Sequence, residues 1–179
     1  MSYPVCLRRA RHMLLLCLTL IAVVILAACG GSGSTGSSTT SGTTCQANQL
    51  DLVREHSGIA TGRIGVEVAF HNHGSSACSL SGYPGVQLLD AQGHAATTHL
   101  QQATSAYTFT NQQVQTVSLA AGALAYFKLE WEDMSVQGCN SSSSAALTPP
   151  GASSALTLAL QVSACNGNIT ISPVEPSAF

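Results

Sequence analysis

From residue 64 onward, apolar and polar side chains alternate in short runs with a period of two. The clearest run is 64–71, in which branched and aromatic residues take every second position and small or polar residues take the others. The same alternation returns over 123–132, where one face ends in Trp131, and over 156–160. Such alternation is typical of a β-strand with one buried face. We therefore predict strands in these three runs.

Shorter strands are predicted between turn-forming residues. The expected segments are 86–89, 94–100 at a sheet edge, 113–119 and 169–171. Residues 90–93 end in a glycine, which is typical of a tight turn, and the low-complexity stretch 141–154 is predicted to be a loop. No segment keeps a helical period. The pattern predicts an all-β fold, an immunoglobulin-like antiparallel β-sandwich of about 7–9 strands.

The N-terminal residues have the three parts of a secretory signal peptide. Three arginines between residues 8 and 11 precede an almost uninterrupted apolar run over 13–25, which is shorter than the about 20 residues of a spanning helix. Leu26-Ala27-Ala28-Cys29 resembles a bacterial lipobox, in which the cysteine is acylated and the chain is cut before it. We predict a lipoprotein signal peptide over 1–28 and lipid attachment at Cys29. An uncleaved signal anchor is the alternative, and either the general or the twin-arginine export route remains open.

A flexible tether is predicted after the acylated cysteine. Residues 30–44 are all Gly, Ser or Thr, and such a segment reaches roughly 20 Å as a random coil. We therefore divide the mature chain into an anchor and tether over 29–44 and one β-sandwich domain over 45–179. The predicted location is the cell membrane, lipid-anchored and facing the extracytoplasmic side.

The charge of the mature chain limits its partners. Without the three signal-peptide arginines, the mature chain has three basic and eight acidic side chains, which gives a net charge of −5. Nucleic-acid binding needs a basic surface, and anionic lipid headgroups also attract basic segments. The predicted partners are the membrane, through the lipid, and an envelope protein or polymer. No nucleic acid is expected.

Four cysteines remain in the predicted domain. An even number in an exported domain implies two disulfides, for which three pairings are possible. We favour the sequential pairing, Cys45–Cys78 and Cys139–Cys165. A metal site is the weaker alternative because no CxxC spacing occurs. A core Trp131 beside a disulfide would suit an immunoglobulin-like sandwich.

Two segments resemble the signature of the domain-of-unknown-function 4232 family. They are Phe-His-Asn-His-Gly at 70–74 and Cys-Ser-Leu-Ser-Gly-Tyr-Pro-Gly-Val at 78–86. Further agreement comes from 119–122, the strand through Trp131, and Cys139 with 165–167. The resemblance covers residues 45 to about 174. It implies a fold and an exported, often lipidated protein, mostly of high-GC Gram-positive bacteria. His73 departs from the more common Thr or Ser, and no catalytic residue follows from the family.

His71 and His73 are the sharpest candidates for a metal site. Residues two apart on a strand point the same way, so both imidazoles could reach one ion. His94 and His99 would join them if their strand lies alongside. A strong site takes three or four ligands, so exposed polar residues near a turn are the favoured interpretation. We predict no cofactor and keep metal binding through His71 and His73 as the alternative function.

Two further clusters have a functional and a structural interpretation. Glu130, Glu132 and Asp133 offer oxygens to a hard cation such as calcium, but a solvated charge at a strand edge is favoured. Tyr107 and Phe109 share a predicted strand face and could stack on a sugar ring, although burial is favoured. Neither cluster is assigned as a site.

Catalytic motifs do not appear in the sequence. We find no Gly-x-Ser-x-Gly elbow, no Ser-x-x-Lys and no phosphate-cradling loop. Tyr83, between Gly82 and Pro84, is predicted to direct its hydroxyl to the backbone as a tyrosine corner does. We therefore predict a membrane-anchored extracytoplasmic lipoprotein whose domain is non-enzymatic and serves binding or structure. Hydrolysis is kept as a third hypothesis, which predicts a pocket lined by a serine or by paired acids.

Overall fold

The computed structural model describes residues 42–133 and 139–179. The chain divides into two units, Met1–Thr39 and Thr40–Phe179, and the described residues all belong to the second. The predicted signal peptide and the predicted lipid-attachment residue Cys29 lie outside the described residues. In the two described ranges, no helix is long and apolar enough to cross a membrane.

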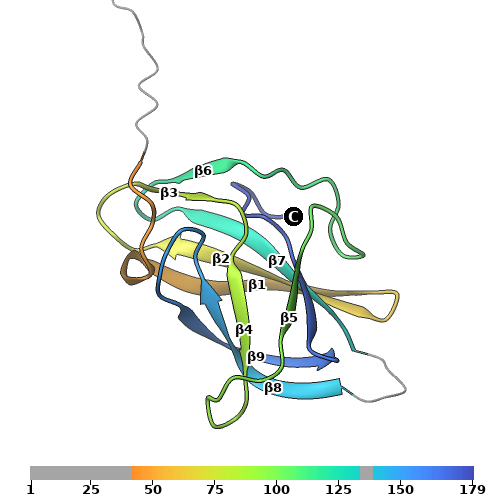
Figure 1. The fold of residues 1–179 in the computed structure, drawn as a ribbon. Helices are drawn as coiled ribbons and strands as arrows, with labels where there is room; N and C mark the ends of the chain where they lie inside the picture. Colours follow the sequence, from red (N-terminus) through yellow and green to blue (C-terminus); the bar gives the residue numbers. More distant parts are fainter. Residues whose placement is uncertain (1–41, 134–138) are drawn as a thin grey trace, which may run out of the picture. The chain divides into compact units, whose positions relative to one another are not determined.

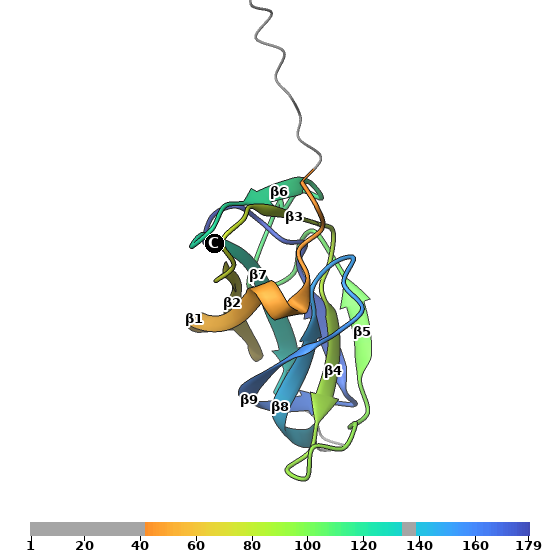
Figure 2. The same cartoon turned by 90° about the vertical axis from the view of Figure 1, so that its left-hand side faces the viewer.

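The described domain is all-β (Figure 1), as the alternation predicts. Its elements are η1 (Ala47–Gln49), β1 (Leu50–Ala60), β2 (Arg63–Asn72), β3 (Cys78–Ser81), β4 (Gly85–Leu89), β5 (His99–Gln102), β6 (Thr116–Leu119), β7 (Leu124–Glu132), β8 (Cys139–Thr148), β9 (Leu156–Cys165) and β10 (Asn168–Ile171). The strands form a five-stranded sheet in the order β1-β2-β7-β10-β5, a two-stranded sheet β3-β6 and a three-stranded sheet β4-β8-β9. Figure 2 shows β4, β8 and β9 side by side.

The core lies between the five-stranded and three-stranded sheets. β2 and β7 pair antiparallel with Val68 opposite Phe127, and the rings of Phe70 and Phe127 stack with their centroids 4.8 Å apart. From the other sheet, β9 contributes the buried Leu160 and Val162. The inward positions are the apolar positions of the sequence pattern, because alternate side chains on a strand leave on opposite faces.

One pair of strands differs from the predicted antiparallel arrangement. β5 runs parallel to β10, with His99 opposite Asn168, and it forms the edge of the five-stranded sheet. The edge position agrees with the prediction for 94–100, but the strand begins only at His99. Residues 113–115 likewise lie outside β6, since Gln113 and Gln115 instead donate hydrogen bonds to Glu175.

The loop predicted over 141–154 is confirmed for 149–154, which connect β8 to β9, but is wrong for 141–148. Residues up to Thr148 belong to β8, which is the central strand of its sheet. Ser142, Ala145 and Leu147 are buried along it. Strand preference depends strongly on the neighbouring strands, and here small side chains let β8 lie between β4 and β9.

Both disulfides have the predicted sequential pairing. Cys45–Cys78 joins the segment before η1 to the start of β3. Cys139–Cys165 joins the directly opposed ends of β8 and β9. Each bond therefore crosslinks segments that are far apart in the chain, which constrains the unfolded state.

Candidate functional site

Two β-bulges interrupt the regular pairing, one in each large sheet. The register of β1 against β2 shifts between Arg54 and Ser57. The register of β8 against β9 shifts between Ser142 and Ser144. A bulge adds a residue to one strand, bends it and redirects its side chains, and bulges are over-represented beside functional sites. Both bulges border the same region of the domain.

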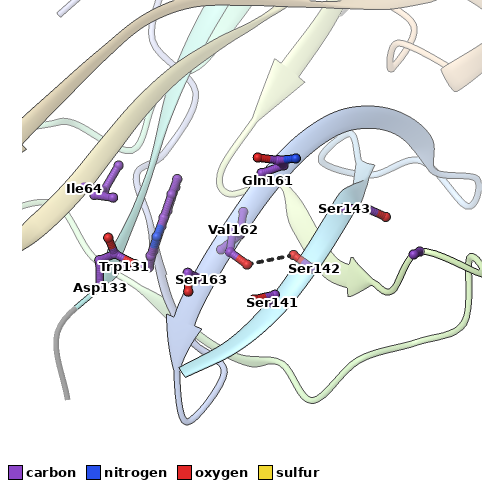
Figure 3. Close-up of a pocket in the computed structure, with 10 residues that line it drawn as sticks. Ile64, Trp131, Asp133, Ser141, Ser142, Ser143, Gln161, Val162 and Ser163 are labelled. Atoms are coloured by element: carbon purple, nitrogen blue, oxygen red, sulfur yellow. Dashed lines mark hydrogen bonds between the residues drawn. The ribbon is translucent and has the colours of Figure 1, made fainter. Parts of the chain in front are cut away.

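A hollow of about 520 Å³ opens beside the bulge between β8 and β9, whose extra residue is in β9. Ile64 of β2 and Trp131 of β7 lie on one side of it, and β8 and β9 form the other side with residues such as Gln161 and Val162 (Figure 3). A second hollow of about 520 Å³ is lined by residues of the β1 bulge, including Arg54 and Ser57. Volumes of this size are typical of small-molecule sites.

Trp131 links the two hollows. It lines both of them, together with Ile64 and Gln161, and we name the two hollows together the Trp131 groove. Trp131 is only 3 % exposed, as expected for a core tryptophan. Its Nε1 is buried and has no acceptor among the described residues. Since buried donors almost always have a partner, and an unsatisfied one costs about 1–3 kcal/mol, this side chain is the unusual feature of the groove.

Short polar side chains form the side of the groove opposite Trp131. The Ser142 hydroxyl donates to the Val162 carbonyl at 3.3 Å, and the Ser143 hydroxyl donates to the Asp90 carbonyl at 2.8 Å. Gln161 is exposed, and its amide offers both a donor and an acceptor. These groups can hydrogen-bond a ligand from one side while Ile64 contacts it from the other.

The hydrolysis hypothesis predicts a pocket lined by serine, and the groove has serines along β8. A serine needs an adjacent base to become a nucleophile. Among the described residues that line the two hollows there is no histidine or lysine, and Asp133 is the acidic one. The serines of this lining can hydrogen-bond a ligand.

His71 and His73 come together around a carboxylate that the sequence did not indicate. Asp51 of β1 lies directly opposite His71 in the register. Its two oxygens lie 3.9 Å from His71 Nδ1 and 3.9 Å from His73 Nε2. Asp51 was not predicted as part of a site because residues 50–60 do not alternate clearly, so that no strand was expected there.

The other two histidines do not join this cluster. His94 lies in the turn after β4, with its Nδ1 3.6 Å from Asp90. His99 is on β5, which β7 and β10 separate from β2. In the described part of the chain, no group of three or more His, Cys, Asp and Glu side chains is placed to hold a metal ion.

Glu130 is buried, which contradicts the predicted solvated edge charge. It is 1 % exposed and lies on β7, inside the five-stranded sheet. Its Oε2 accepts hydrogen bonds from the backbone N–H of Thr108 at 2.6 Å and from the Thr108 hydroxyl at 2.8 Å. The prediction failed because the loop between β5 and β6 covers this face of the sheet. Glu132 instead pairs at the surface with Arg63 at 3.5 Å.

Tyr107 and Phe109 do not share a strand face. They lie in the loop between β5 and β6, where Phe109 is buried and Tyr107 is 63 % exposed. The guanidinium carbon of Arg63 lies 5.0 Å from the centroid of the Tyr107 ring.

Tyr83 is partly buried against the core, beside Gly82, whose φ of +96° favours glycine.

Residues 45–175 match the model of a protein family described as a domain of unknown function (DUF4232). The chain belongs to this family. The DUF4232 domain therefore contains all four disulfide cysteines and both bulges. Neither the curated proteins nor the solved structures gave a match to the chain.

Proposed function

We propose that this DUF4232 protein is a lipid-tethered, extracytoplasmic binding domain without enzymatic activity, and that the Trp131 groove is its binding site. The observation that carries the proposal is the unsatisfied indole N–H on the side chain that lines both hollows. We infer that a ligand bound in the groove supplies the missing acceptor, since a buried donor without a partner is costly.

The disulfides and the tether support the proposed location. Disulfides persist in oxidising compartments, and the domain has two of them. The lipobox at 26–29 supplies the anchor, and the Gly/Ser/Thr segment 30–44 lets the domain reach the surrounding envelope. The net charge of the mature chain supports an envelope protein or polymer as partner rather than nucleic acid.

The test uses the single tryptophan of the chain. An ¹⁵N spectrum of the mature chain, with Cys29→Ser to omit the lipid, has one indole N–H signal. We expect this signal to shift when a protein, lipid or glycan fraction of the cell envelope is added. Tyr107 provides the control, because a Tyr107→Phe variant changes an exposed aromatic outside the groove and should respond as the parent does. The proposal is wrong if none of the three fractions moves the indole signal.

The second candidate function is metal binding by His71 and His73. The observation that favours it is the Asp51 carboxylate between the two imidazoles, which would raise the number of ligands to three. The half-buried His71 and the exposed His73 would have to turn their imidazoles toward a common point. Calorimetric titration with zinc and with copper tests this function, with His71→Ala and His73→Ala as variants. Absence of heat at micromolar metal would eliminate it.

A further inference from the structure

We propose that the ligand of the Trp131 groove is a neutral, hydroxyl-rich molecule, namely a segment of an oligosaccharide. This inference rests on the proposed function and specifies its ligand class.

The charges around the groove favour a ligand without net charge. Asp133 lines one hollow and Arg54 lines the other. An anion that fills both hollows would meet the Asp133 carboxylate, and a cation would meet the Arg54 guanidinium. An ionic group that loses its hydration needs an opposite charge and hydrogen bonds to offset the cost, and a like charge at one end of the groove opposes this. A neutral ligand avoids both conflicts.

The polar lining favours a ligand whose groups both donate and accept hydrogen bonds. Serine hydroxyls and the Gln161 amide act in both directions. The hydroxyls of Ser142 and Ser143 already donate within the domain, so they remain available mainly as acceptors. The Trp131 indole is a donor only. Sugar hydroxyls can satisfy both kinds of group, since each has one donor and two acceptor positions.

The shape of the groove favours a chain rather than a single small molecule. Its two hollows are neighbours because they share Ile64, Trp131 and Gln161. They lie at bulges on opposite sheets, so that a bound chain would contact β1 at one end and β8 at the other. Because the Trp131 indole is almost fully buried, it does not form an exposed stacking platform.

The experiment measures the indole N–H signal and the binding heat of the mature Cys29→Ser chain with maltohexaose, chitohexaose and xylohexaose. We expect at least one hexasaccharide to shift the signal saturably. Trp131→Phe, which keeps an aromatic ring but loses the donor, should weaken that binding about three- to tenfold. Gln161→Ala changes an exposed residue and should fold normally but also bind more weakly, whereas Tyr107→Phe should bind as the parent does.

The outcomes separate the ligand class from the binding function. If no hexasaccharide and no envelope glycan fraction moves the indole signal while the protein or lipid fraction does, the oligosaccharide proposal is overturned and the binding function stands. If all oligosaccharides and all fractions leave the signal unchanged, both proposals fail. Binding that persists unchanged in both Trp131→Phe and Gln161→Ala would overturn the assignment to this groove.

Discussion

Two buried glutamates and the half-buried Lys128 hold a long loop against the outer face of the five-stranded sheet. Glu130 accepts two hydrogen bonds from Thr108, and the Lys128 ammonium donates to the Thr108 carbonyl at 3.1 Å. Glu175 accepts from the backbone N–H of Gln113 at 2.7 Å. Because the two carboxyl groups are removed from water, their hydrogen bonds to the loop are needed to offset desolvation. The loop between β5 and β6 is therefore part of the folded domain.

Glu130→Ala should lower the free energy of unfolding by about 2 kcal/mol, because two half-buried donors of Thr108 lose their carboxylate acceptor. Urea denaturation measures the change. Glu132→Ala is the matched control on the same strand, since its carboxylate is half exposed and pairs with Arg63 at the surface. It should cost less than about 1 kcal/mol. Equal losses in the two variants would contradict the structural role of Glu130.

Gly65→Ala should also destabilise the domain. A Cβ at Gly65 would lie 2.5 Å from the hydroxyl oxygen of Thr108, so the loop would have to move away from β2. We expect a cost of about 1–3 kcal/mol, as for other overpacked positions. Gly58→Ala is the control in β1, because a Cβ there meets nothing within 4 Å. If Gly65→Ala unfolds at the same urea concentration as the parent, the loop does not pack as described.

At the level of elements, the turn after β4 is held by one carboxylate. Asp90 Oδ1 accepts hydrogen bonds from the backbone N–H groups of His94 at 2.8 Å and Gln92 at 2.9 Å. Gly93 donates back to the Asp90 carbonyl and has a φ of +81°. The sequence predicted this turn correctly, because aspartate at its first position and glycine at its fourth are the residues that the turn favours.

The pKa of Asp90 is lowered from its ordinary value of 3.8, first by the hydrogen bond from the His94 backbone. A carboxyl whose pKa is lower in the folded state stabilises that state above the unfolded pKa. This contribution is lost as the pH falls through the lower, folded pKa. We therefore expect an NMR titration of the Asp90 carboxyl carbon to have its midpoint below 3.8. A midpoint at or above 3.8 would contradict the described turn.

The strands that the sequence predicted best are those with one apolar face. β2, β7 and β9 alternate because they lie over the core, so the pattern reports their burial directly. β1 was missed because it is an edge strand and most of its side chains are exposed. β8 was missed because its serines resemble a linker, although its position between β4 and β9 makes it a strand. For these two strands, the neighbouring strands decide the structure, and local composition does not reveal them.

The candidate site was less predictable than the fold. Trp131 was expected in the core, and it lies there. The groove beside it depends on two bulges, one in β1, which the sequence did not predict, and one in β9, whose alternation does not reveal the bulge. The Asp51 contact with the two histidines likewise depends on the pairing of β1 with β2. Such sites arise from register and twist, which hydrophobic alternation does not encode.

For the whole molecule, the proposed function requires a disulfide-crosslinked domain that is tethered to a membrane anchor. The disulfides Cys45–Cys78 and Cys139–Cys165 stabilise the domain where thiols are oxidised. Stable anchoring takes more than one acyl chain, because a single chain binds a membrane only marginally. A tethered binding domain follows only if Cys29 is acylated after export and both disulfides form in the same molecule.

The most direct test is the intact mass of the protein purified from the membranes of the cells that make it. The predicted molecule begins at an acylated Cys29, has lost residues 1–28, and contains two disulfides and no free thiol. Reduction and alkylation before the measurement should add label at four cysteines only. A chain that still begins at Met1, has no lipid and contains free thiols would contradict the proposed location and the function that depends on it.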